Sequence, residues 1–267
     1  MPGKVRFEGF NATEMSEKFE GKSRRKRERL ELNLPARVYG RESEDLEWVE
    51  QTRLLDVTPF GVRFSLSRPT EPGRLLHLTL PMPRQLRCFD HVEDQYRVWM
   101  LVRNMRTIEA TNDKPARYEV GAAFIGKRPP QSFEKDPATL YEVASSATET
   151  GLWDVAERED LTERRVPKDE PRPESRYHIP VEVIIEILDE KGKVAASEMT
   201  VTENISRRGA AVLTTLNVTR GRFVRVVSAQ YGISVIAAVR AYRVGANGIP
   251  RLHLEFVDKQ WPLEGIE

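Results

Sequence analysis

The sequence has little of what secreted or membrane-spanning proteins require. Its 267 residues include one cysteine, Cys88, so an intrachain disulfide is excluded. This fits the cytosol, because structural disulfides belong mainly to oxidising compartments. No apolar run approaches the roughly 20 residues of a membrane helix, and the N-terminal stretch lacks the hydrophobic core of a signal peptide. We therefore expect a cytoplasmic protein with no membrane span.

The sequence also lacks the usual signatures of an enzyme. It contains neither a Gly-rich phosphate-binding loop nor a dinucleotide-binding fingerprint. Its four histidines form no pair with metal-ligand spacing: His77, His91, His178 and His253. The net charge of +1 supplies no global field that would attract nucleic acid. We predict a non-catalytic protein without cofactor or metal.

Short strands separated by turn residues fill most of the chain. Val, Thr and aromatic runs are bounded by Gly, Pro, Asn and Asp, a pattern typical of a small barrel or sandwich. In the first half we predict strands at 30–39, 47–56, 61–66, 74–80, 96–108 and 117–125. In the second half we predict strands at 177–188, 194–203, 209–214, 222–229, 232–243 and 250–257. The chain is long enough for two domains of ordinary size.

A polar turn stands between two strands of the second half. It reads Asn-Ile-Ser-Arg-Arg-Gly over residues 204–209. Asn204 and Ser206 have short side chains that can hydrogen-bond nearby backbone and hold a turn. Gly209 permits either a positive φ or a close backbone approach. Two arginines, Arg172 and Arg176, stand four positions apart before the preceding strand.

The same layout occurs in the first half. Arg25 and Arg29 precede a strand-like run, and Asp-Val-Thr-Pro-Phe-Gly at 56–61 follows it. Arg29 and Asp56 are 27 positions apart, whereas Arg176 and Asn204 are 28 apart. A shared order at nearly shared spacing indicates an internal repeat.

An Arg-x-x-x-Arg segment, a strand, and an Asp/Asn-x-Ser-x-x-Gly turn together resemble the PilZ family. The resemblance covers most of residues 24–146 and 172–258. It implies an all-β protein of two tandem PilZ-like barrels, and a receptor for the bacterial second messenger cyclic di-GMP. The ligand-binding residues that it implies are Arg172, Arg176, Asn204, Ser206, Arg207, Arg208 and Gly209 in the second repeat, and Arg25, Arg29, Asp56, Thr58 and Gly61 in the first.

The first repeat departs from the family pattern. Thr58 replaces the motif serine, which keeps the hydroxyl and adds a methyl group. Pro59 and Phe60 occupy the positions of Arg207 and Arg208. Because positive charge is missing there and proline has no backbone donor, we expect the second site to dominate.

The boundaries that we predict are a tail at 1–22, a PilZ-like domain at 23–146, a charged linker at 147–171, a second PilZ-like domain at 172–258 and a tail at 259–267. Asp136 and Pro137 are typical of a helix start, so we expect a short helix from there to about Ser146, after the first barrel. The segment Arg84 to Asp94 has a much shorter counterpart in the second half, which indicates an insertion.

The function expected is a non-catalytic cyclic di-GMP receptor or adaptor that signals to a downstream protein by changing how its two barrels are arranged. Two alternatives stay open. One is a protein-interaction module in which one or both PilZ-like sites are silent. The other, which we rank well below it, is nucleic-acid binding through the basic run at residues 23–29.

Overall fold

A computed structural model describes residues 33–112, 115–147, 152–158, 176–245 and 248–263. Strands of the first half are β1 Pro35–Arg41, β2 Glu47–Thr58, β3 Gly61–Leu66, β4 Leu75–Leu80, β5 Tyr96–Ile108 and β6 Arg117–Gly126. Strands of the second half are β9 Glu182–Leu188, β10 Val194–Ile205, β11 Gly209–Leu213, β12 Phe223–Ser228, β13 Ile233–Val244 and β14 Pro250–Phe256. The remaining elements are a 3₁₀ turn Arg84–Leu86, the helix α1 Gln131–Lys135, and strands β7 Tyr141–Ala147 and β8 Trp153–Glu157.

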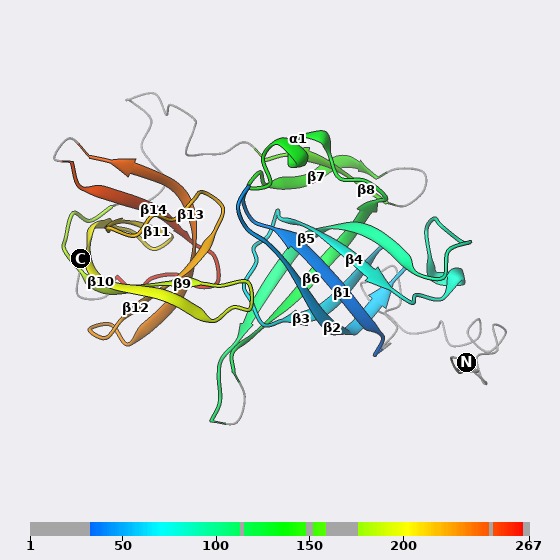
Figure 1. Cartoon of the computed structure of the whole chain (residues 1–267), viewed down its shortest axis with the longest axis horizontal. Coiled ribbons are helices and arrows are strands. Elements are labelled where there is room, and N and C mark those ends of the chain that lie inside the picture. Colours follow the sequence, from blue (N-terminus) through cyan, green and yellow to red (C-terminus); the bar gives the residue numbers. More distant parts are fainter. Residues whose placement is uncertain (1–32, 113–114, 148–151, 159–175, 246–247, 264–267) are drawn as a thin grey trace.

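Two closed antiparallel barrels account for the twelve strands of the two halves (Figure 1). The first barrel runs β1-β2-β3-β6-β5-β4, and the second runs β9-β10-β11-β14-β13-β12 in the same cyclic order. Each barrel encloses its own apolar core, in which alternate residues of every strand point inward. The predicted all-β fold of two tandem PilZ-like barrels is confirmed.

The expected short helix after the first barrel is present, but its predicted bounds, Asp136 to about Ser146, are wrong. The helix lies earlier, at Gln131–Lys135, and residues 141–147 form strand β7, which pairs with β8. Asp136 caps a turn instead, because its carboxylate accepts the backbone N–H of Ala138 at 3.0 Å. The residues that follow form a strand because this buries Tyr141 against Leu75 and Leu101 on the outer face of the first barrel.

Strand β8 lies inside the range expected to be a charged linker. Its pairing with β7 forms a two-stranded sheet on the first barrel. Just before it, Leu152 packs against the first barrel's core, whereas Trp153 is 36% exposed. Residues 153–157 of the range therefore form a strand, whereas 148–151 and 159–171 lie outside the described residues.

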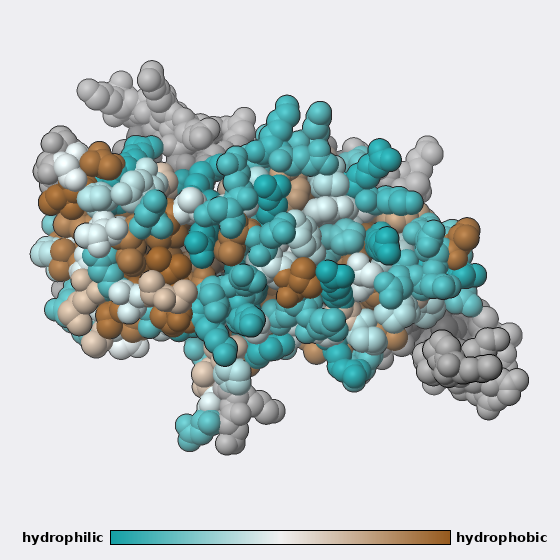
Figure 2. Space-filling view, viewed as in Figure 1, coloured by the Kyte–Doolittle hydropathy of each residue, from teal (hydrophilic) through white to brown (hydrophobic). Residues whose placement is uncertain are grey.

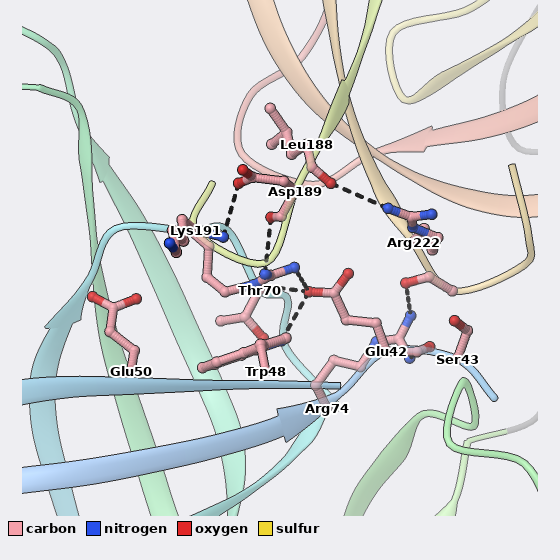
Figure 3. Close-up of polar contacts among 12 residues, drawn as sticks. Glu42, Ser43, Trp48, Glu50, Thr70, Arg74, Leu188, Asp189, Lys191 and Arg222 are labelled. Atoms are coloured by element: carbon pink, nitrogen blue, oxygen red, sulfur yellow. Dashed lines mark hydrogen bonds and ion pairs between the residues drawn. The ribbon is translucent and has the colours of Figure 1, made fainter. Parts of the chain in front are cut away.

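The two barrels contact each other through an apolar cluster and a set of buried charges. Tyr118 of the first barrel packs with Leu188, Phe223 and Ile236 of the second. Figure 3 shows Glu42 and Arg74 of the first barrel facing Leu188, Asp189 and Arg222 of the second.

Arginines carry hydrogen bonds across this interface. Arg68 donates to the carbonyl of Asp189 at 3.0 Å, and Arg74 donates to that of Gly221 at 2.8 Å. Arg240 of β13 donates to both oxygens of Glu71 in the first barrel. Burial raises the pKa of Glu71, but Arg74 and Arg240 lower it by more. The Glu71 carboxylate is therefore held charged while it is buried between the two barrels.

The surfaces of the two barrels differ in composition. In Figure 2 the visible face of the second barrel, at left, carries more hydrophobic residues than that of the first. Among the described residues, the exposed large apolar side chains of the second barrel are Val194, Met199, Tyr242, Val244 and Ile249. No helix in the described part of the chain combines the length and apolarity needed to cross a membrane.

Candidate functional site

The turns at 56–61 and 204–209, here called the first and second corners, occupy equivalent positions in the two barrels. Each joins the second strand of its barrel to the third. The pairing shifts by one residue just before each corner, between Leu54 and Asp56 and between Thr202 and Asn204. Such a bulge re-aims the side chains that follow it, so Asp56 and Asn204 lie on the outer face while their neighbours fill the cores.

The two corners share their internal hydrogen bonds. The hydroxyl of Thr58 donates to the carbonyl of Gly61 at 3.3 Å, and that of Ser206 donates to the carbonyl of Gly209 at 3.2 Å. Ser206 is buried, so its hydroxyl is directed into the turn. The motif hydroxyls thus hold the turn itself.

The motif glycines are explained by close packing of strands. Neither Gly61 nor Gly209 has a positive φ. A Cβ on Gly61 would lie 2.6 Å from the carbonyl oxygen of Ala122, and one on Gly209 would collide with that of Leu254. Each glycine therefore lets the last strand of its barrel approach the corner.

Arg176 lies beside the second corner. The next residue, Tyr177, exchanges two backbone hydrogen bonds with Ile205, each 2.9 Å long. This bridge attaches the segment that follows the arginine motif to the end of β10, between Asn204 and Ser206. Arg176 is exposed there. Of the other motif arginines, Arg172, Arg25 and Arg29 lie outside the described residues.

A row of outer-face residues crosses the second barrel from the second corner. Strand register places Asn204 opposite Ala211, Ala211 opposite His253, and His253 opposite Ala241. We call these four residues the second row. Asn204 and His253 are half-buried and Ala211 is buried. The second row thus carries an amide and an imidazole separated by a small side chain.

The equivalent first row is Asp56, Arg63, Gly121 and Asn104. The guanidinium of Arg63 donates to the carboxylate of Asp56 at 2.7 Å. The amide of Asn104 lies over Gly121, where an added Cβ would meet its oxygen at 2.6 Å. The first row is therefore filled by side chains of the protein itself.

Different segments cover the two corners. The backbone carbonyl of Pro59 accepts the Cys88 thiol at 2.7 Å, from the predicted insertion between β4 and β5. Arg87 orders that insertion by donating to the carbonyls of Met82, Asp90, Glu93 and Asp94. At the second corner, the carbonyl of Arg207 accepts the backbone N–H of Trp261 instead, at 2.8 Å.

Positive charge gathers around the second corner. Arg207 and Arg208 are exposed on the turn, and Arg176 stands beside it. Burial lowers the pKa of His253, and the charges of Arg243 and Arg176 lower it further. The imidazole is therefore neutral at neutral pH, in a surrounding that favours anions. In the part of the chain that the structure describes, no group of acids, histidines and cysteine is arranged to hold a metal ion.

The sequence motifs bring some candidates together and miss others. Arg176, Asn204, Arg207 and Arg208 lie at or beside one corner, and their role in binding stays a prediction. His253 and Arg63 were missed, because neither belongs to a motif. The alternation in β14, where Leu252 and Leu254 point into the core, could have placed His253 on the outer face.

Fold and corners together define a tandem of two PilZ-like β-barrels. No protein-family model and no curated protein matches the sequence. Solved structures do resemble it at low identity.

The inhibitor of motility MotI/DgrA of Bacillus subtilis has a TM-score of 0.28 and 10% identity over 86% of this chain and 90% of that chain. The PlzA protein of Borreliella burgdorferi, solved with c-di-GMP, has a TM-score of 0.27 and 10% identity over 89% and 90%. YcgR of Escherichia coli, also solved with c-di-GMP, has a TM-score of 0.27 and 11% identity over 84% and 76%.

Proposed function

We propose that the protein is a non-catalytic cyclic di-GMP receptor whose main site is the second corner. The observation that carries the proposal is the backbone bridge between Tyr177 and Ile205. It holds Arg176 next to the corner that carries Asn204, Arg207 and Arg208. Such a receptor acts in the cytoplasm.

The chemistry of this corner suits the ligand. Cyclic di-GMP offers two anionic phosphodiesters and two guanines, whose O6 and N7 atoms accept hydrogen bonds. Arginine grips a phosphate with a planar pair of donors, and the same fork pairs with O6 and N7 of guanine. Arg172 and Arg176 are proposed to close over the ligand while Asn204 contacts a guanine edge. Ser206 and Gly209 support the corner from within the fold.

The first corner is proposed to contribute little to binding. Asp56 already has a guanidinium partner in Arg63, and Cys88 donates to the Pro59 carbonyl of the turn. A ligand would have to displace these contacts before Arg25, Arg29, Asp56, Thr58 or Gly61 could bind it. This observation favours the alternative of an interaction module for the first barrel alone.

A route for the signal leads from the second corner to the interface. Glu255 lies directly opposite Gly209 in the strand register and accepts the Arg240 Nε–H at 2.7 Å. Arg240 in turn binds Glu71 of the first barrel. We propose that an anionic ligand at the corner changes how Arg240 shares its hydrogen bonds between these two carboxylates, and thereby how the two barrels are arranged. A downstream protein then recognises the changed arrangement of the barrels. This requires that the ligand bind the two arrangements with different affinities.

Calorimetric titration of the full chain with cyclic di-GMP tests the receptor proposal, with GMP and cyclic di-AMP as controls. We expect saturable binding of cyclic di-GMP and much weaker binding of both controls. Equal affinity for cyclic di-AMP would show that the site does not recognise guanine. An absence of binding would leave the interaction module as the better account.

A further inference from the structure

We infer that His253 is a further ligand-contacting residue of the second corner, and that it takes up a proton when the anionic ligand binds. The inference rests on the proposed function and adds a residue that belongs to neither motif. It also gives the receptor a defined dependence of affinity on pH.

The position of His253 follows from strand register. It lies on the outer face of β14, opposite Ala211, which lies opposite Asn204. Neighbouring strands are about 4.8 Å apart, so residues two strands apart on one face are about 10 Å apart. One guanine with its ribose and phosphate spans such a distance. A ligand whose base contacts Asn204 therefore extends across Ala211 to the imidazole.

The charges around the imidazole are mainly positive. Burial lowers the pKa of His253 most, and the charges of Arg243 on β13, Arg176 before β9 and Arg251 on its own strand lower it further. Glu203 of β10 is the acidic neighbour, and Arg251 holds its carboxylate at 2.8 Å. Strand β11 contributes only the side chain of Ala211 to this row. His253 is thus a neutral group in an environment that repels a proton.

An anionic ligand reverses that environment. Two phosphodiesters placed beside Arg176 and His253 offset the guanidinium charges and favour the imidazolium. The pKa of His253 is then higher in the complex than in the unliganded protein. Binding therefore strengthens as pH falls through the pKa of the complex, and it stops changing below the pKa of the unliganded protein. The phosphodiesters themselves do not titrate in this range.

Titrations of the full chain with cyclic di-GMP at pH 8.0, 7.0, 6.0 and 5.5, at one ionic strength, test the inference. For wild type we expect binding about tenfold tighter at the acidic end if the ligand raises the pKa by one. His253→Gln should bind with nearly the same affinity at every pH. His178→Gln is the matched control, because His178 is exposed near the same arginine segment, and it should keep the wild-type dependence.

A second readout measures the proton directly. At pH 6.5, binding enthalpies in PIPES and in imidazole buffer, which differ in ionisation enthalpy, should differ for wild type and coincide for His253→Gln. Wild-type affinity that does not change with pH overturns the inference and leaves the receptor proposal intact. So does a pH dependence that survives in His253→Gln or disappears in His178→Gln. If no variant binds at any pH, the receptor proposal fails and the inference falls with it.

Discussion

The two barrels share one topology and one turn, yet they differ along the outer face beside that turn. In the first row, Arg63 pairs with Asp56 and the Asn104 amide lies over Gly121. In the second row, Ala211 and Ala241 stand where those side chains would be, with His253 between them. The corner motif thus holds a turn in both barrels, whereas residues of the neighbouring strands set which side chains surround each corner.

The barrels also differ in what covers a second equivalent surface. Leu75 and Leu101 of the first barrel lie under Phe133 and Tyr141, which come from α1 and β7. Their counterparts in the second barrel, Phe223 and Ala238, pack instead in a cluster with Tyr118 of the first barrel. The second barrel therefore uses the first as its cover.

The largest expected effect separates two arginines at the same position of the two barrels. Arg240 of β13 is buried against Glu71, whereas its counterpart Arg103 of β5 is exposed. Arg240→Met should lower the free energy of unfolding by roughly 3–5 kcal/mol, because it leaves Glu71 without one of its two partners. Arg103→Met should change it by no more than about 0.5 kcal/mol. Urea unfolding of both variants measures the difference, and equal effects would show that the interface charge is not a stabilising contact.

The next effect concerns the motif arginines. Arg176→Ala should weaken cyclic di-GMP binding by roughly 1.5–3 kcal/mol, the cost of a lost charged hydrogen bond. Arg176→Lys should recover only part of this, because lysine lacks the planar fork. Arg29→Ala, the equivalent change in the first repeat, should have a much smaller effect. Calorimetry on the full chain measures the affinity of each variant. A larger loss of affinity in Arg29→Ala than in Arg176→Ala would reverse the ranking of the two sites.

A smaller effect on binding is expected from substitutions at the first residue of each corner. Asn204→Ala should weaken binding by about 0.5–1.5 kcal/mol, which corresponds to one neutral hydrogen bond. Asp56→Ala should leave binding unchanged, because Arg63 already occupies that carboxylate. The same titrations measure both variants. Comparable losses in the two would mean that the Asp56–Arg63 pair opens to admit ligand.

The smallest effect should be the same in both barrels. Ser206→Ala and Thr58→Ala each remove a hydroxyl that donates to a glycine carbonyl of its own turn. Each should lower the free energy of unfolding by about 0.5–1 kcal/mol. Thermal unfolding and ligand titration of both variants check this. If Ser206→Ala abolishes binding at unchanged stability, its hydroxyl contacts the ligand instead.

Strand positions could be predicted closely because they depend on local pattern. The predicted strand 96–108 has the bounds of β5, and the predicted 61–66 has those of β3. The helix expected from Asp136 was misplaced for the opposite reason. A capping residue is compatible with a turn as well as with a helix, and the burial of Tyr141 on the first barrel favoured a strand. The sequence allowed two roles for Gly209, a positive φ or a close backbone approach, and it could not choose between them. The structure shows the close approach.

Two repeats of alternating strands, each with a polar turn after its second strand, can be read from the amino-acid pattern, because side-chain alternation and turn chemistry act between near neighbours. The face that Asp56 and Asn204 occupy cannot be read in this way, since it depends on a one-residue shift between paired strands of the closed barrels. The tertiary structure also decided that Arg63 fills the first row while His253 lies in the second. Those contacts join residues far apart in the chain, and their energies exist only once the barrels have closed.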